Sequence, residues 1–447
     1  MAKVIQQAIK KKSLRWLIAI LCFNLILPIS SNATDKILDD SEQMVHAGEV
    51  LTLVQCVAIA RKYHPNIITA NATIALTNSR VVQAKADYFP HINLQPSYAK
   101  SKSAYTGSPD SSYSGAVNLS QNIYDFGRRE TNLVAQKFAV QAAQEDTVDA
   151  EQTVICAVKV AYFNLLQAQE NKLICESTLK QFEAHLTQAV AFFEIGVKPQ
   201  IEVTKARTDV GSAKLSLIQA QGSVGVAKSA LTNAMGLFAL PEYSIATTEK
   251  TDVSVLLQPL PTVTVASQEA LLHRSNWKSM VNKIASLKAS LELARNGYYP
   301  SIAGTATANY ANNEFPLNDS WSAGIALNIP VFDGFATAGK IAEAKANLAI
   351  TEASAQSLRS QIFTEVEQAL IYTQNAQQAI IVAKMTCESA DENLAIANGR
   401  YNAGLGNPIE ISDAILTLNK AKLSYAISVR DYRIAIVTLD RVMGIER

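Results

Sequence analysis

The sequence contains one series of short motifs twice, in the same order. Tyr88-Phe89-Pro90 recurs as Tyr298-Tyr299-Pro300, and Tyr124-Asp125 recurs as Phe332-Asp333. Gly196, followed six residues later by Glu202, recurs as Gly404 and Glu410. Because the offsets are all 208 to 210 residues, we interpret the chain as two copies of one long unit rather than as an array of short repeats. We expect the first repeat over residues 51–236, a connecting segment over 237–265 and the second repeat over 266–447.

Each repeat contains one very long stretch without proline, between Pro109 and Pro199 and between Pro330 and Pro408. Ala, Gln, Glu, Lys and Leu dominate these stretches, which favours helix. Long helices are predicted from Arg128 to Phe192 and from Ala336 to Tyr401, each roughly 100 Å long at 1.5 Å per residue. Shorter helices are predicted over 51–87, 200–235, 267–296 and 407–443. The two shorter helices of a repeat together match its long helix, so they can pack end to end along it.

Between the first short helix and the long helix of each repeat, the hydrophobic period changes to two. In the first repeat Ile92 to Tyr98 alternate with polar neighbours, a polar loop runs to Ser112, and Val117 to Ile123 alternate again. In the second repeat the corresponding segments are Ile302 to Tyr310 and Trp321 to Ile329, around a loop with Asn312, Asn313, Pro316, Asn318 and Asp319. Each is a strand of about ten residues, the length of a tilted membrane-spanning β-strand. The fold class is therefore mostly α with a small β part.

Aromatic residues gather where these strands meet the helices. They are Tyr88, Phe89, Tyr124, Phe126, Tyr298, Tyr299, Phe332 and Phe335. This placement is typical of an interfacial girdle of a membrane barrel. Packing at strand-helix junctions would also place aromatic residues there.

Four strands cannot close a membrane barrel, because known barrels need at least about eight. If the strands enter a membrane, several chains must therefore contribute to one barrel. The alternative, from another class of protein, is an exported helical scaffold or adhesin that forms no pore. Amphipathic strands distinguish the two interpretations, since a helical scaffold does not need them.

The N-terminus has the pattern of a secretory signal peptide at residues 1–33. Lys10, Lys11, Lys12 and Arg15 precede an apolar stretch from Trp16 to Leu27, and small residues follow. This segment holds five of the 40 basic residues and none of the 39 acidic ones, so the remainder carries a net charge of −4. A nucleic-acid partner is not expected for such a chain. Residues 34–50 are interpreted as an N-terminal extension.

Together these features resemble the TolC-type outer membrane efflux proteins. The motifs that carry the resemblance are those before the strands, the segments 122–127 and 329–334 after them, and Arg400-Tyr401-Asn402-Ala403-Gly404 at a helical turn. The resemblance implies a homotrimer in which each chain gives four strands to one twelve-stranded barrel in outer membrane lipid. An α-helical tunnel would continue it through the periplasm, with segment 237–265 at its equator. It further implies a periplasmic adaptor, an inner-membrane pump or secretion ATPase that supplies the energy, and passive export through the channel.

Two helix-helix turns are expected at the tip of this tunnel. Gly196 and Gly404 supply the backbone freedom of a tight turn, and Pro199 and Pro408 fall near the start of the following helix. Turn formation alone would account for these residues. The resemblance implies that the turns meet the adaptor, through Ile195, Gly196, Val197, Lys198, Arg400, Ala403, Gly404 and Leu405.

Glu410 and Asp413 lie three residues apart and hence on one helix face. The resemblance implies that they point inward and ring the tunnel near its constriction, with Glu202 as the first-repeat equivalent of Glu410. A trimer would then carry six carboxylates from Glu410 and Asp413, which attract cations. The alternative is that acidic residues in a first helical turn complement the helix dipole, which accounts equally well for Glu202.

One position departs from the family pattern. A basic residue two positions after the turn glycine helps to hold the tip closed in the family, whereas this chain has Gly406 there. Lys198 occupies the corresponding place in the first repeat. We therefore hypothesise that Lys198 substitutes for the missing basic residue.

No enzymatic function is expected. The segment from Gly334 to Lys340 matches the phosphate-loop spacing GxxxxGK, but Ile341 stands where the magnesium-binding Ser or Thr should be, and the equivalent junction of the first repeat has no such loop. The five histidines show no metal-ligand spacing, so neither a metal nor a cofactor is predicted.

Overall fold

The computed structural model describes residues 48–102, 109–238, 242–246 and 259–445. The predicted signal peptide at 1–33, most of the extension at 34–50 and much of the connecting segment lie outside these residues. Contacts divide the chain into two units, Leu51–Phe238 with Ile245–Arg447, and a small one that includes Val50 and Ala239–Ser244. In the small unit the Gly48 N–H donates to the Glu242 carbonyl (2.7 Å), and the Ser244 N–H donates to the Glu49 carbonyl (3.0 Å).

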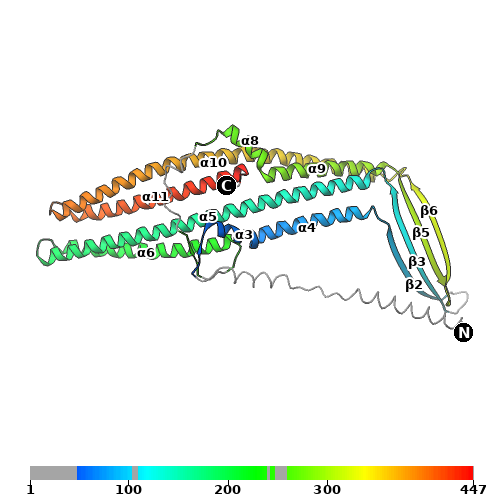
Figure 1. Cartoon of the computed structure of the whole chain (residues 1–447), viewed down its shortest axis with the longest axis horizontal. Coiled ribbons are helices and arrows are strands. Elements are labelled where there is room, and N and C mark those ends of the chain that lie inside the picture. Colours follow the sequence, from blue (N-terminus) through cyan, green and yellow to red (C-terminus); the bar gives the residue numbers. More distant parts are fainter. Residues whose placement is uncertain (1–47, 103–108, 239–241, 247–258, 446–447) are drawn as a thin grey trace. The chain divides into compact units, whose positions relative to one another are not determined.

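The same order of elements occurs twice in the large unit (Figure 1). The first series is α3 (Leu53–Tyr63), α4 (Pro65–Ala86), β2 (His91–Lys102), β3 (Pro109–Tyr124), α5 (Arg128–Glu194) and α6 (Gln200–Ala234). The second is α8 (Val263–His273), α9 (Ser275–Arg295), β5 (Ser301–Asn312), β6 (Asn318–Asn328), α10 (Ala336–Asn402) and α11 (Pro408–Met443). Short pieces β1 (Val50–Leu51), β4 (Ser244–Ile245) and the 3₁₀ turn η1 (Asn296–Tyr298) complete the described elements. The mostly helical fold with a small β part is confirmed.

The first short helix of each repeat was predicted as one piece, and this is wrong. His64 separates α3 from α4 and Arg274 separates α8 from α9, both with nearly the same extended backbone angles (φ −66° and −63°, ψ 124°). Pro65 explains the first break, since the residue before a proline disfavours helix. The second break has no proline. A packed glycine faces both breaks: a Cβ on Gly236 would lie 2.6 Å from His64 Cα, and one on Gly444 would lie 2.7 Å from Arg274 N.

The helices pack side by side along their lengths. Helix α5 contacts α3, α4, α6, α9 and α11, and α10 contacts α8, α9 and α11. Two 67-residue helices, each about 100 Å long, therefore carry the shorter helices. Small and branched apolar residues fill the contacts, as in the cluster of Ile362, Val366 and Leu439 between α10 and α11. Within the described residues, no helix combines the length and the apolar character that crossing a membrane requires.

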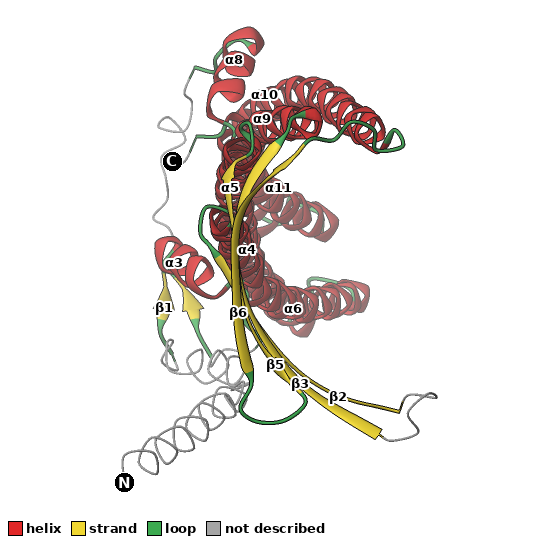
Figure 2. Cartoon of the chain, turned by 90° about the vertical axis from the view of Figure 1, so that its right-hand side faces the viewer, coloured by secondary structure: helices red, strands yellow, loops and turns green. Residues whose placement is uncertain are grey.

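The four long strands form one antiparallel sheet in the order β2-β3-β5-β6, which is strongly curved in Figure 2. They are 12, 16, 12 and 11 residues long, longer than predicted. Residues 109–112 belong to β3 and Asn312, Asn318 and Asp319 belong to β5 and β6, so the predicted loops were too long. The strands β2 and β6 are the two edges of the sheet.

Candidate functional site

The two predicted tip turns have the same backbone hydrogen bonds. After α5, the Gly196 N–H donates to the Phe193 carbonyl (3.0 Å) and the Val197 N–H donates to the Phe192 carbonyl (3.0 Å). After α10, the Gly404 N–H donates to the Tyr401 carbonyl (2.9 Å) and the Leu405 N–H donates to the Arg400 carbonyl (2.9 Å). Both glycines have φ 76°, so both turns are Schellman motifs that need a left-handed residue at the same place.

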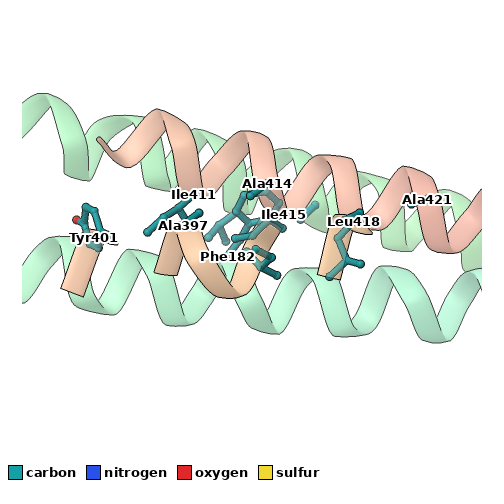
Figure 3. Packing of buried hydrophobic residues seen from close by; sticks show 12 residues of the cluster. Phe182, Ala397, Tyr401, Ile411, Ala414, Ile415, Leu418 and Ala421 are labelled. Carbon is teal, nitrogen blue, oxygen red and sulfur yellow. The ribbon is translucent and has the colours of Figure 1, made fainter. Parts of the chain in front are cut away.

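Tyr401 lies at one end of the buried cluster behind these turns (Figure 3). Its side chain is 1% exposed, although it belongs to the last turn of α10. Its ring contacts His185 and Phe192 of α5, at centroid distances of 5.4 and 5.7 Å. Ile411, Ile415 and Leu418 of α11 belong to the same buried cluster, which also includes Val210 of α6. One aromatic side chain thus joins the two helical hairpins α5–α6 and α10–α11.

Lys198 and Glu202 of the first turn lie against Tyr401. The Lys198 Nζ is 3.4 Å from Glu202 Oε1 and 5.4 Å from the centroid of the Tyr401 ring. The Tyr401 hydroxyl donates to Glu202 Oε2 at 3.4 Å. Burial, with the Glu202 charge as a second cause, raises the pKa of Tyr401 to about 12. The phenol therefore stays protonated, and the three groups form a polar bridge from one hairpin to the other.

Gly406, the departure from the family pattern, has a packing reason. A Cβ built there would lie 2.8 Å from Tyr401 N and 3.0 Å from Tyr401 Cα. Real Cβ atoms do not approach backbone so closely, so any side chain at this position would push the second turn away from α10. The second turn therefore has no room for a basic residue in this conformation.

Glu410 and Asp413 lie in different surroundings from Glu202. Both are exposed on the first turns of α11, whereas the Glu202 side chain is only 11% exposed. Glu410 Oε2 accepts from Arg400 Nε at 3.4 Å, in a pair whose side chains are about half exposed. The structure thus groups Glu202 with Lys198 and Tyr401, and groups Glu410 with Arg400.

His185 and Asp209 belong to the same region and were not singled out from sequence. His185 is 5% exposed, and its Nδ1 has no hydrogen-bond partner among the described residues. Burial lowers its pKa, against a smaller opposing effect of Asp209 and Glu202. The Ser412 hydroxyl donates to Asp209 Oδ2 at 2.6 Å, which adds a polar link from α6 to α11. A helical position alone gives no sign of such a contact across some 200 residues.

Apolar side chains stand exposed at both turns. Ile195, Val197 and Leu405 are 70%, 62% and 75% exposed, and Ala403 is exposed as well. Single exposed apolar residues are common, but a group of three on two adjacent turns is typical of a binding surface. These are the residues expected to contact an adaptor.

The long sheet has two chemically different faces. Strand pairing places Leu94 opposite Val117, Val117 opposite Ala308, and Ala308 opposite Trp321, so these four share a face. On the other face the same pairing brings Asn93 to Asn118 and Asn118 to Thr307. The Thr307 hydroxyl donates to the Asn118 amide oxygen at 3.1 Å. We define the first as the apolar face and the second as the polar face of the sheet.

The predicted aromatic girdle lies at the helix end of the sheet. Tyr124 contacts Phe126 (4.7 Å between ring centroids), Phe126 stacks on Tyr299 (6.0 Å), and Phe332 contacts Phe335 (5.5 Å). The Arg129 guanidinium lies over the ring of Tyr88, with Cζ 4.9 Å from the ring centroid. The other members, Phe89 and Tyr298, are 66% and 53% exposed.

A second group of aromatic residues, missed from sequence, lies at the loop end of the sheet. We define the outer aromatic group as Tyr98, Tyr113, Tyr310, Phe315 and Trp321. Tyr98, Tyr113, Tyr310 and Trp321 belong to the apolar face by strand pairing. Eleven residues separate Tyr113 from Tyr124 along β3, about 36 Å of strand or about 25 Å across a bilayer at a 45° tilt. The alternation of β3 contained this signal, because Tyr113 has the same parity as Val117 and Leu119.

The segment that resembles a phosphate loop forms the junction from β6 to α10. Asp333 Oδ2 accepts from the Thr337 N–H at 2.8 Å, and Gly334 and Phe335 both have positive φ. The first repeat has the same junction, in which Asp125 Oδ2 accepts from the Arg129 N–H (3.2 Å) and Nε (2.9 Å). In both junctions an Asp side chain therefore caps the start of the long helix. The positive φ of this turn accounts for Gly334 without nucleotide binding.

Comparison with known proteins agrees with this architecture. The model of the outer membrane efflux protein family matches residues 57–237 and 266–445. The outer membrane protein TolC of Vibrio cholerae is 24% identical over 406 residues, which cover 85% of this chain and 89% of that protein. The outer membrane channel CmeC of Campylobacter jejuni superposes with a TM-score of 0.75 at 20% identity, over 88% of this chain and 85% of that one. The open state of the MtrE outer membrane channel of Neisseria gonorrhoeae gives 0.75 at 19% identity, over 88% and 89%. The chain therefore belongs to the outer membrane efflux protein family.

Proposed function

We propose that three copies of this chain form one channel across the outer membrane and the periplasm. Each copy contributes β2, β3, β5 and β6 to a twelve-stranded barrel, and its helices to a tunnel below it. The two-faced sheet carries this proposal. Its apolar face, with Leu94, Trp321 and Ile325 at 57%, 80% and 75% exposure, needs lipid, while its polar face suits a water-filled lumen.

The edges of the sheet supply the reason for oligomerisation. Strands β2 and β6 each pair with one other strand in the described part of the chain. Unpaired backbone groups cannot be left in hydrocarbon, where water does not satisfy them. Pairing β6 of one copy with β2 of the next satisfies both edges and closes the ring. The residues proposed for the membrane interface are Tyr88, Phe89, Tyr124, Tyr298, Tyr299 and Phe332, together with the outer aromatic group.

At the tip of the helical tunnel, the turns after α5 and α10 have different roles. Lys198, Glu202 and Tyr401 hold the hairpins α5–α6 and α10–α11 together and keep the tip closed. Glu410 and Asp413, exposed beside the second turn, face the passage and attract cations. Glu202, although expected at the constriction, serves mainly in the closing bridge.

Partners follow from the passive character of the channel. An inner-membrane pump or secretion ATPase supplies the energy, and a periplasmic adaptor binds the exposed apolar residues Ile195, Val197, Ala403 and Leu405 at the turns. The chain itself carries out no catalysis and needs no cofactor.

The test is the mass of the detergent-purified protein in solution, followed by single-channel recording in planar bilayers. A mass of three chains and discrete conductance steps are expected. A monomer that does not insert would contradict the proposal and favour the helical scaffold. A variant with Ile195, Val197 and Leu405 all changed to Ser should keep trimer mass and conductance but lose binding to an adaptor.

A further inference from the structure

The cationic residues of the four described strands lie together. Lys100 and Lys102 near the end of β2 are the two Lys or Arg residues in these strands. Both are exposed, and no ion pair involves either of them within the described part of the chain. A cation in a membrane strand is costly at mid-depth and costs little near the interface. Their position therefore deserves a specific explanation.

Strand pairing places both lysines on the apolar face. Lys100 lies opposite Ser111 and Lys102 opposite Pro109, in register with the pair Tyr98 and Tyr113. Alternate residues of a strand share a face, so Lys100 and Lys102 follow Tyr98 on the same side. They lie about 7 and 14 Å beyond Tyr98 along the strand. In the proposed barrel this is the height of lipid head groups in the outer leaflet.

An aromatic surface adjoins the lysines. The rings of Tyr98 and Tyr113 are 5.1 Å apart, and the rings of Tyr113 and Phe315 are also 5.1 Å apart. Tyr98 and Phe315 are 59% and 67% exposed, which leaves much of their surface available to a ligand. Exposed rings of this kind pack against the C–H faces of sugars, and the hydroxyl groups of Tyr98 and Tyr113 provide hydrogen bonds.

Toward the helix end of the strands, away from the lysines, small residues leave a shallow apolar groove. Gly304, Ala306 and Ala323 form its floor, between Leu119 and Ile325. These five residues belong to the apolar face by strand pairing, and Gln121 also lines the groove. Acyl chains pack against exposed apolar surface of this kind in a membrane.

We infer that Lys100 and Lys102 bind the phosphates of an acylated, phosphorylated sugar lipid in the outer leaflet. The rings of Tyr98 and Phe315 pack against its sugars, and its acyl chains lie along the apolar face. Lysine ammonium groups pair with phosphate as point charges. This inference rests on the proposed function, because the barrel places the apolar face against lipid. It adds a ligand and the residues that recognise it.

Asp319 offers the competing explanation. It lies on the apolar face of β6, opposite Tyr310, and β6 is the edge that would meet β2 of the adjacent copy. Lys100 or Lys102 could then pair with Asp319 across the seam between copies. Such a pair would stabilise the trimer without any lipid, which makes the two explanations separable.

The experiment is native mass spectrometry of the purified trimer in mild detergent with added lipid A, a bisphosphorylated diglucosamine lipid. The wild type is compared with K100Q/K102Q, and with K384Q/K420Q as a control that removes two exposed lysines from the tunnel helices. We expect K100Q/K102Q to weaken retention of lipid A at least tenfold, and the control to retain it unchanged. The same lipid without its phosphates should bind the wild type as weakly as lipid A binds K100Q/K102Q.

Three results would overturn the inference. They are unchanged retention in K100Q/K102Q, equal loss in K384Q/K420Q, and equal binding of the lipid without phosphates. The seam explanation would replace it if D319N and K100Q/K102Q lowered the melting temperature of the lipid-free trimer equally. Trimer mass and conductance are recorded on the same samples, so a failure of the channel itself is distinguished from a failure of lipid binding.

Discussion

The two tip turns share one backbone conformation but differ in the side chains that they carry. Both are Schellman motifs with a glycine at φ 76°, at the ends of helices of equal length. Two residues after the glycine, the first turn has Lys198 and the second has Gly406. Six residues after it, Glu202 is 11% exposed in the polar bridge, whereas Glu410 is 46% exposed beside Arg400. The two repeats share the fold of the turn while its side chains differ, and this difference underlies the proposal that one turn closes the tip and the other lines the passage.

Replacing Tyr401 with Ala should have the largest effect on this comparison, because both hairpins pack against its ring. Removal of a buried aromatic ring costs about 3–4 kcal/mol of the free energy of unfolding. We expect faster hydrogen exchange at both turns and a higher conductance of the isolated trimer. Tyr401→Phe keeps the ring and removes the hydroxyl, so it should give a small fraction of the effect. Exchange that increased at only one turn would show that Tyr401 does not join them.

Gly406→Ala should destabilise the second turn, whereas Gly211→Ala should not destabilise its helix. The new Cβ at residue 406 would meet the Tyr401 backbone at 2.8 Å, while nothing lies within 4 Å of one at residue 211. Overpacking of this kind costs about 1–3 kcal/mol. Gly211→Ala, within α6, should instead stabilise by a few tenths to about 1 kcal/mol. Equal melting temperatures for the two variants would contradict the close packing of Gly406.

Lys198→Ala tests whether the first turn closes the tip. Loss of the ion pair with Glu202 and of the cation-π contact with Tyr401 should cost about 1–2 kcal/mol. We expect higher conductance of the isolated trimer. Lys172→Ala is the matched control, since Lys172 forms an ion pair with Glu176, also four residues away, at 3.6 Å. Unchanged conductance in Lys198→Ala would reject the proposed role of Lys198.

His185 should give the smallest effect, visible only with pH. Burial lowers its pKa from 6.5, so the unfolded chain binds a proton more readily than the folded protein. The folded state is therefore favoured above pH 6.5 and loses this stability as pH falls below it. His185→Gln should flatten the fall in melting temperature between pH 7 and pH 5, and the exposed His91→Gln should not. A wild-type slope retained in His185→Gln would show that other groups cause the pH dependence.

Much of the fold follows from sequence because its determinants are local or periodic. The period of two predicted all four long strands, and the long helices end within two residues of prediction. The break at Arg274 could not be predicted, because no proline marks it and the glycine packed against it, Gly444, lies 170 residues away. Tyr98, Tyr310 and Trp321 were predicted in strands, but their grouping with Tyr113 depends on how the four strands pair, which the sequence does not specify.

The sequence identified residues of the candidate site but not which of them contact one another. A resemblance between motifs identified Lys198, Glu202 and Glu410, but it assigned Glu202 and Glu410 one common role. Glu202 contacts Tyr401, which lies 199 residues later in the chain. Glu410 contacts Arg400, which lies ten residues earlier, before the turn. Pairwise placement of this kind arises from the packing of two hairpins, which no single segment encodes.

The most direct test of the account compares two variants of the trimer in single-channel recordings under a salt gradient. Lys198→Ala should raise the conductance and leave the reversal potential unchanged, because it opens the tip without altering the charge of the passage. A double variant with Glu410→Gln and Asp413→Asn should shift the reversal potential toward zero, because it removes the carboxylates that favour cations. The division of roles between the two turns would be contradicted if both variants changed only the conductance or only the reversal potential. It would also be contradicted if the double variant kept its cation selectivity.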